Sequence, residues 1–169
     1  MIRRNFLFGS AGALAALTGS AFILGNRRAG SAMADSFEIT KTDEEWRSIL
    51  TEEQFAVLRE EATERAFTSP LNNEKREGLF HCAGCDLPLY SSEVKYDSGT
   101  GWPSFWEALP NAIGTKPDNS LFMTRTECHC RRCGGHLGHI FDDGPPPTGK
   151  RHCINGVAMT FRPGPTMPS

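Results

Sequence analysis

Hydrophobic positions recur with a helical period in the part of the chain that precedes Pro70. The segments 42–45 and 51–54 each begin with threonine and end with Glu or Gln, the pattern of a capping box at a helix N-terminus. Apolar residues follow at helical spacing: Trp46, Ile49 and Leu50 after the first segment, and Phe55 and Leu58 after the second. The pattern predicts two short helices in series, each with one apolar face.

Beyond Pro70 the helical period is lost, and short apolar runs alternate with clusters of Gly, Pro, Asn and Asp. Such runs are typical of strands joined by turns. They cover residues 78–82, 88–92, 121–130, 136–141 and 152–163. The Gly-Pro-Pro-Pro sequence at 144–147 predicts an extended loop between the last two strands. We see no internal repeat and no second domain, so residues 35–169 are expected to form a single, mainly β domain with short N-terminal helices.

Residues 1–34 have two arginines, Arg3 and Arg4, ahead of an apolar run, and no acidic residue. This composition indicates an export signal. The order Arg-Arg-Asn-Phe-Leu before a weakly hydrophobic core is typical of twin-arginine signals, and Ala34 ends a small-x-small cleavage pattern. We predict passage through the twin-arginine translocase, cleavage after Ala34 and a periplasmic or exported location. An uncleaved membrane anchor is the alternative.

The charge balance argues against nucleic acid as a partner. The whole chain has 18 Lys and Arg against 20 Asp and Glu, a net charge of −2. Residues 1–34 contain four of the arginines and no acid, so the other 135 residues have 14 basic and 20 acidic side chains and a net charge of −6. An acidic domain lacks the basic surface that binding to a phosphate backbone requires.

Four of the six cysteines form two C-x-x-C pairs, Cys82 with Cys85 and Cys130 with Cys133. A C-x-x-C turn presents both sulfurs on one side, and two such turns can close a tetrahedral thiolate site. We therefore predict one structural zinc ion per chain, with iron as the alternative metal. Disulfides are the competing interpretation in an oxidising compartment. The histidine that precedes each pair could also replace a cysteine as ligand.

Cys153 stands apart from these pairs, with Arg151 two residues before it and Asn155 two residues after it. In a strand these three side chains point to one face, so a guanidinium and a carboxamide would flank the thiol. The preceding apolar run could lie beside this strand and bring His136 and His139, which suit proton transfer near neutral pH. The arrangement favours a reactive thiol. A buried cysteine acting as a small hydrophobic residue is the alternative.

The Gly-rich segment 98–106 contains three large aromatic residues, Trp102, Phe105 and Trp106. Large aromatic side chains on such a loop are expected either to pack in the core or to form the wall of a binding site. Sulfur–aromatic contacts are favourable, so a methyl sulfide or sulfoxide would suit such a wall.

Three segments, together with the two C-x-x-C pairs, closely resemble the methionine sulfoxide reductase B family: YDSGTGWPSF at 96–105, GGHLGHIF at 134–141 and RHCINGVAMTF at 151–161. The resemblance extends over about residues 43–163. It implies a fold of mostly antiparallel strands in two sheets with short N-terminal helices. It also implies reduction of the R epimer of methionine sulfoxide, free or in oxidised proteins and peptides, with a thioredoxin-like or other thiol reductant.

The resemblance gives each candidate residue a role. Cys153 matches the nucleophile that attacks the sulfoxide sulfur and is left as a sulfenic acid. The polar groups around the sulfoxide oxygen are matched by His136, His139 and Asn155. Trp102 matches the wall that receives the methyl group, and we group Phe105, on the same loop, with it as substrate-binding. Arg151 is expected to favour the thiolate form of Cys153.

One position departs from the family pattern. Many members have a resolving cysteine in the Gly-rich loop, where this chain has Thr100. The only spare thiol is Cys128, which shares a strand face with Cys130 and is expected to be a small buried residue beside the metal site. We therefore predict a one-cysteine cycle in which an external reductant meets the Cys153 sulfenic acid directly. Cys128 as the resolving cysteine is the alternative.

Two other functions fit part of the pattern. A non-catalytic zinc-ribbon binding module would explain the paired cysteines, but it would leave the tryptophan loop and the two histidines without a role. A thiol peroxidase would use Cys153 against hydroperoxides. Fast alkylation of Cys153 would argue against the first alternative, and comparison of peroxide with sulfoxide as oxidant would test the second.

Overall fold

The computed structural model describes residues 37–119 and 124–166, so the export signal predicted for residues 1–34 lies outside the described residues. Two α-helices come first, α1 (Asp43–Ile49) and α2 (Glu52–Glu60). The described residues then form nine strands: β1 (Gly78–Cys82), β2 (Pro88–Ser91), β3 (Lys95–Tyr96), β4 (Ser104–Phe105), β5 (Ile113–Asp118), β6 (Arg125–Cys130), β7 (His136–Phe141), β8 (Arg151–Ile154) and β9 (Met159–Pro163). Short 3-10 helices occur at η1 (Pro70–Asn73), η2 (Ser92–Val94) and η4 (Gly156–Ala158).

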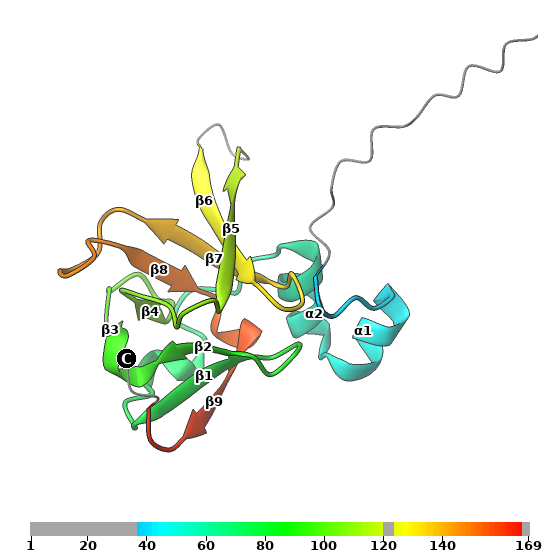
Figure 1. Cartoon of the computed structure of the whole chain (residues 1–169), viewed down its shortest axis with the longest axis horizontal. Coiled ribbons are helices and arrows are strands. Elements are labelled where there is room, and N and C mark those ends of the chain that lie inside the picture. Colours follow the sequence, from blue (N-terminus) through cyan, green and yellow to red (C-terminus); the bar gives the residue numbers. More distant parts are fainter. Residues whose placement is uncertain (1–36, 120–123, 167–169) are drawn as a thin grey trace, which may run out of the picture. The chain divides into compact units, whose positions relative to one another are not determined.

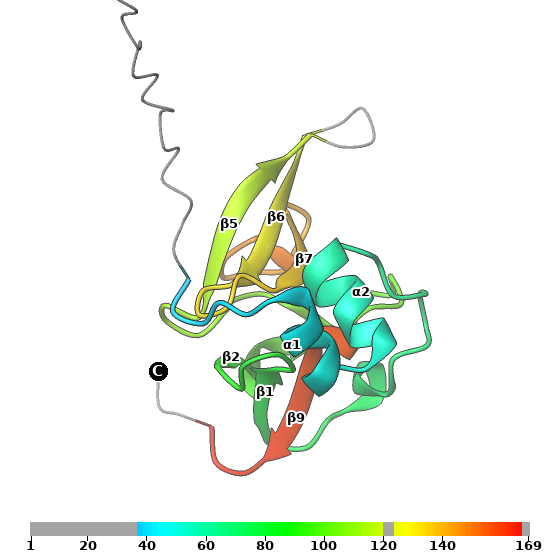
Figure 2. The same ribbon diagram turned by 90° about the vertical axis from the view of Figure 1, so that its right-hand side faces the viewer.

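The strands build two sheets (Figure 1). The smaller sheet has the order β2-β1-β9, and the larger has the order β3-β4-β8-β7-β6-β5. Every pair of neighbouring strands is antiparallel. Helix α2 packs against β7 and η4 (Figure 2). These findings confirm the expected mainly β fold with two antiparallel sheets and short N-terminal helices.

Both capping boxes form as predicted. Thr42 Oγ1 accepts from the Glu45 backbone N–H at 3.2 Å, and the Glu45 carboxylate accepts from the Thr42 N–H at 2.8 Å. The box at 51–54 makes the same pair of bonds. The predicted apolar face of the first helix is only partly correct: Trp46 is buried, but Ile49 is 54% exposed, because α1 ends at this residue. Neither helix of the described residues has the length and apolar character needed to cross a membrane.

An aromatic cluster joins the two sheets. Tyr90 of β2 stacks on Phe105 of β4 with ring centroids 4.3 Å apart, and Phe80 of β1 meets Phe105 edge to face at 5.0 Å. All three side chains are fully buried. Complete burial of a side chain of this size contributes roughly 1.5–3 kcal/mol, so the cluster is a substantial part of what holds the sheets together.

Most of the predicted strands are confirmed, but their number and limits differ. Strands β3 and β4 have two residues each, which is too short for an alternating pattern to be recognised. Strand β5 contains Gly114 and Pro117, which are unfavourable in strands, yet it lies at a sheet edge, where proline is tolerated. Of the run 121–130, residues 121–123 lie outside the described residues. The run 152–163 is two strands, because Asn155 and η4 interrupt it.

Candidate active site and metal centre

The two C-x-x-C pairs come together as predicted. Cys82 ends β1 and Cys130 ends β6, while Cys85 and Cys133 lie in the turns that follow these strands. All four sulfurs lie within 4.8 Å of one another. Cys82 Sγ is 3.7 Å from Cys133 Sγ, and Cys85 Sγ is 3.4 Å from Cys130 Sγ. Since β1 belongs to the smaller sheet and β6 to the larger, the cluster links the two sheets.

The geometry of this cluster fits a metal ion. Four sulfurs about 2.3 Å from a tetrahedral zinc ion lie about 3.8 Å from one another, which is close to the observed separations. Disulfides would need sulfurs about 2.05 Å apart, and all six cysteines are free. The neighbouring histidines have other partners: His81 Nδ1 lies 3.1 Å from the Asp86 carbonyl oxygen, and His129 Nδ1 lies 3.0 Å from Glu127 Oε2. The ligand set is therefore the four cysteines.

Cys153 lies on β8, an interior strand of the larger sheet between β4 and β7. It pairs with Ser104 on one side and with His139 on the other, which confirms the predicted neighbouring strand. The half-buried thiol lines a small cavity of about 120 Å³. Three more of the predicted residues line this cavity, Trp102, His139 and Asn155, together with Thr63, Arg125, Gly138 and Phe141.

Arg151 makes its main contacts with Asp143. Its Nε and Nη2 each lie 2.8 Å from a carboxylate oxygen of Asp143, and its guanidinium lies 4.3 Å from the centroid of the Phe141 ring. The hydrogen-bonded carboxylate raises the pKa of Arg151. Burial raises the pKa of Cys153, and the Thr100 hydroxyl and the Arg151 guanidinium oppose this only in part. The resting sulfur is therefore mostly thiol at neutral pH.

The proton position on His139 is set by its partner. Nε2 lies 2.8 Å from Asp118 Oδ2, which also accepts from Arg125 Nη2 at 2.6 Å. An ionised carboxylate only accepts hydrogen bonds, so Nε2 carries the hydrogen and Nδ1 is the unprotonated nitrogen of the neutral ring. Burial lowers the pKa of His139, although the bond to Asp118 opposes this effect. His139 can therefore take up a proton at Nδ1.

His136 lies behind His139 and does not line the cavity. It is 3% exposed, and its ring centroid is 5.5 Å from that of His139. Its Nδ1 donates to Glu127 Oε1 at 2.7 Å, and Glu127 also accepts from His129. Burial alone would raise the pKa of Glu127, but the hydrogen bonds from the two histidines lower it to about 2. Glu127, which the sequence did not single out, is thus a buried carboxylate that fixes the ring of His136.

The carboxamide of Asn155 is engaged in structural hydrogen bonds. Its Nδ2 donates to the Leu137 carbonyl oxygen at 2.9 Å, and its Oδ1 accepts from the Glu64 backbone N–H at 2.8 Å. β8 ends at Ile154, but Asn155 keeps an extended backbone and its N–H bonds the Leu137 carbonyl oxygen of β7. It lines the cavity, but its oxygen is already bonded.

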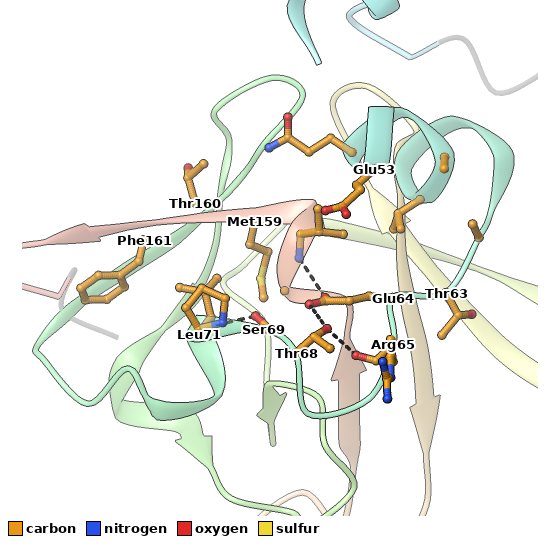
Figure 3. Close-up of a pocket in the computed structure, with 17 residues that line it drawn as sticks. Glu53, Thr63, Glu64, Arg65, Thr68, Ser69, Leu71, Met159, Thr160 and Phe161 are labelled. Atoms are coloured by element: carbon orange, nitrogen blue, oxygen red, sulfur yellow. Dashed lines mark hydrogen bonds between the residues drawn. The ribbon is translucent and has the colours of Figure 1, made fainter. Parts of the chain in front are cut away.

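The segment 62–69, which carries no recognisable motif, holds both Trp102 and Asn155. The Glu64 carbonyl oxygen accepts from Trp102 Nε1 at 2.9 Å, and the Glu64 N–H bonds Asn155. The Glu64 carboxylate accepts from the Val157 N–H at 3.0 Å and from Thr68 Oγ1 at 3.4 Å (Figure 3). One residue of this segment therefore fixes two walls of the cavity.

A larger groove of about 800 Å³ lies next to the cavity (Figure 3). Its walls come from α2, residues 62–71, η4 and β9. Thr63 lines both the groove and the cavity that contains Cys153. The site thus has open space directly beside it.

Phe105 does not belong to the cavity wall, contrary to prediction. It is fully buried in the aromatic cluster between the sheets. Neighbouring residues of a strand point to opposite faces, and Ser104, the neighbour of Phe105, is the residue that pairs with Cys153. Phe141, at the end of β7, supplies an aromatic side chain to the cavity instead.

Cys128 is fully buried, as predicted, but it is not one of the four clustered cysteines. It pairs with Gly138, and Gly138 pairs with Ile154, so β7 separates it from β8. Two strand spacings amount to about 10 Å, whereas a disulfide needs Cα atoms within about 7 Å. Burial also raises the pKa of Cys128. This arrangement does not favour Cys128 as a resolving cysteine.

Comparison with known proteins gives a consistent match. Residues 50–163 match the SelR domain. The chain is 52% identical over 127 residues to a protein of Agrobacterium fabrum named peptide methionine sulfoxide reductase MsrB, with 75% of this chain and 94% of that protein covered. A protein of the same name from Methanosarcina barkeri is 50% identical over 125 residues, covering 73% and 88%. The chloroplastic peptide methionine sulfoxide reductase B1 of Oryza sativa is 48% identical over 128 residues, covering 75% and 60%.

Proposed function

The chain belongs to the methionine sulfoxide reductase B family, whose domain is called SelR, and from this premise we propose that it reduces the R epimer of methionine sulfoxide to methionine. One observation carries the proposal: Cys153, Trp102 and His139 line the same small cavity. The thiol can supply electrons, the indole suits a methyl group on sulfur, and the imidazole can transfer a proton.

The reaction balances without a proton from outside the site. The Cys153 sulfur attacks the sulfoxide sulfur and the sulfur–oxygen bond of the substrate breaks. The oxygen moves to the Cys153 sulfur, where a new sulfur–oxygen bond forms, and the transient bond between the two sulfurs breaks. Cys153 is left as a sulfenic acid, and the sulfide leaves. The substrate sulfur gains the electron pair that the cysteine sulfur loses. The thiol proton of Cys153 ends on the sulfenic oxygen.

We assign the transfer of this proton to His139. Its Nδ1 is unprotonated in the neutral ring, and it stands opposite Cys153 on the neighbouring strand. It takes the proton as the sulfur attacks and returns it to the oxygen. His136 packs against His139 from behind, and the Arg151 guanidinium favours negative charge on the attacking sulfur.

We assign the four-cysteine cluster to one structural zinc ion per chain, with Cys82, Cys85, Cys130 and Cys133 as its ligands. Zinc is the usual ion of closed four-thiolate sites, and such a site leaves no open position for a substrate. Bound zinc would neutralise part of the thiolate charge. The cysteines hold the turns after β1 and β6 against each other.

Recycling of Cys153 requires a reductant from outside the chain. With Thr100 in the loop and Cys128 two strands away, we propose that a thioredoxin-like or other thiol attacks the sulfenic acid directly. The composition of residues 1–34 supports export through the twin-arginine translocase, with cleavage after Ala34. In the periplasm or outside the cell the enzyme would repair oxidised exported proteins, and the groove beside the cavity offers room for the polypeptide that flanks the sulfoxide.

Cys153→Ser tests the proposal, and it should abolish methionine production from the R sulfoxide while folding and metal content are kept. The measurement is methionine formed from each pure sulfoxide epimer with a dithiol reductant. Cys128→Ser, which changes a buried cysteine outside the cavity, is the matched control and should retain activity. Activity above a few per cent in Cys153→Ser, or equal wild-type rates on the two epimers, would contradict the assignment.

A further inference from the structure

A chain of three hydroxyl groups ends on the sulfur of Cys153. Thr100 Oγ1 lies 3.9 Å from Cys153 Sγ and 2.8 Å from Ser98 Oγ. Ser98 Oγ lies 2.7 Å from Ser104 Oγ, which donates to the Trp102 carbonyl oxygen at 3.1 Å. Ser104 is fully buried. The Gly-rich loop and β4 thus present a connected set of hydroxyls to the reacting atom.

The direction of each hydrogen bond in this chain follows from its last acceptor. A carbonyl oxygen only accepts, so the hydroxyl hydrogen of Ser104 points to Trp102. Each hydroxyl has one hydrogen, so Ser104 accepts from Ser98, and Ser98 accepts from Thr100. Thr100 is left with a lone pair for Cys153 and accepts from the thiol hydrogen. All hydrogens of the chain point away from the sulfur in this arrangement, so Thr100 can stabilise the deprotonated sulfur only after its hydroxyl turns.

We propose that Thr100 is a further catalytic residue, whose hydroxyl switches from accepting the hydrogen of the Cys153 thiol to donating a hydrogen bond to the deprotonated sulfur. A rotation of the hydroxyl makes the switch and breaks the bond to Ser98. A hydrogen bond to an ionised group is roughly twice as strong as a neutral one, so the new bond outweighs the one that is lost. The proposal rests on Cys153 being the reacting thiol of the proposed function.

The charged groups around Cys153 stabilise the ionised sulfur only in part, so a hydroxyl donor can add to this stabilisation. Arg151 favours the ionised sulfur, but Asp143 binds Arg151 through both carboxylate oxygens and opposes it. Arg125 on β6, which is paired with Asp118, and His139 on β7 line the cavity with the sulfur. Tyr96 on β3 and Cys128 on β6 are the other titratable groups within electrostatic reach. Because Asp143 offsets part of the guanidinium charge, a hydrogen-bond donor in contact with the sulfur contributes more to stabilising the ionised form.

The test is the pH dependence of Cys153 alkylation by iodoacetamide, followed by mass spectrometry of the Cys153 peptide from the metal-loaded protein. Thr100→Val keeps the size of the side chain but removes the hydroxyl, and it should slow alkylation near neutral pH about three- to tenfold. Ser98→Ala removes the acceptor that restrains the Thr100 hydrogen, and it should accelerate alkylation by a similar factor. Thr100→Ser keeps the hydroxyl and should restore most of the wild-type rate.

Opposite changes in Thr100→Val and Ser98→Ala would support the switch, because a loop that was merely disturbed would change in one direction. Equal rates in Thr100→Val and the wild type, or a Ser98→Ala variant slowed as much as Thr100→Val, would overturn it. Thermal midpoints of the variants ensure that folded proteins are compared. Alkylation needs no sulfoxide, so it tests the switch independently of the reductase activity. If the alkylation rates change as expected but the protein does not reduce sulfoxide, only the proposed function is contradicted.

Discussion

At the scale of single residues, the close approach of β7 to β8 depends on Gly138. An added Cβ there would lie 2.1 Å from the Cys153 carbonyl oxygen. Gly138→Ala should therefore lower the free energy of unfolding by about 3 kcal/mol and reduce turnover, because the strand that carries the nucleophile must shift. Denaturant unfolding measures the change.

Gly149→Ala is the control for this substitution, since nothing lies within 4 Å of its added Cβ and its φ is +69°. The expected loss is about 1 kcal/mol, from backbone strain alone. Equal losses in the two variants would show that contact with Cys153 does not decide the effect.

His152 gives the fold a dependence on pH. It is 8% exposed, its Nδ1 lies 3.2 Å from the Tyr90 hydroxyl, and burial lowers its pKa to about 4. The unfolded value is about 6.5, so the folded state prefers the neutral ring. The neutral ring makes its full contribution to the unfolding free energy above about pH 6.5. This contribution is lost as the pH falls through 4, and it amounts to about 3 kcal/mol at most.

His152→Gln removes this titration and should flatten the fall of the unfolding free energy between pH 6.5 and pH 4. Denaturant unfolding at several pH values measures it, with the wild type as reference. Curves that fall in parallel for the two proteins would assign the acid sensitivity to other groups.

The predicted site residues that line the cavity each have a chemical signature of their own in the sequence: Cys153, Trp102, His139 and Asn155. The hydrogen bonds of Asn155 and the burial of Phe105 could not be predicted, because they depend on which distant segments pack against these residues. Glu64 and Glu127 are ordinary acidic residues in the sequence. Their roles arise only from the hydrogen bonds that the fold gives them.

At the scale of elements, the Glu64 carboxylate ties the segment 62–69 to η4 through the Val157 N–H, and the Glu64 backbone in turn bonds Trp102 and Asn155. Glu64→Ala should raise the KM for sulfoxide about tenfold, the effect expected from losing a hydrogen bond to a charged group. The alkylation rate of Cys153 should stay unchanged, since β8 does not depend on this carboxylate.

Glu53→Ala is the control for Glu64→Ala, because Glu53 lines the neighbouring groove but not the cavity. Steady-state kinetics with the R sulfoxide gives KM and kcat separately for both variants. An unchanged KM in Glu64→Ala, or an equal rise in Glu53→Ala, would show that the Glu64 carboxylate does not position the segment whose backbone bonds Trp102.

Elements were predictable where the chain is long enough to show a period. The capping boxes and apolar spacing predicted α1 and α2, and apolar runs predicted β1, β2 and β7. Strands β3 and β4 escape prediction because two residues show no period, and their conformation comes from pairing with each other and with β8. Strand β5 owes its place to pairing with β6.

At the scale of the whole domain, the four-cysteine cluster ties the β1-β2 hairpin to the β6-β7 hairpin. Structural zinc sites contribute on the order of 10 kcal/mol, which is comparable with the stability of an entire domain. Removal of the metal by a chelator, or Cys133→Ser, should therefore unfold or precipitate the protein.

Elemental analysis and the thermal midpoint measure this effect, and about one zinc per chain is expected in the intact protein. Cys128→Ser changes a buried cysteine outside the cluster and should keep its metal. Soluble, active protein that contains no metal would refute the assignment.

The interior position of β8 also bears on how the site moves. The Ile154 and Asn155 amides are bonded to the Pro103 and Leu137 carbonyl oxygens, so hydrogen exchange at both should be slow. The Glu64 N–H instead donates to the side chain of Asn155, and Glu64 lies in a segment without regular structure. Such segments open at lower free energy. We therefore expect local opening in this wall of the cavity and not in β8. A brief opening of that wall would admit a methionine sulfoxide of a folded protein without disturbing the strand that carries Cys153.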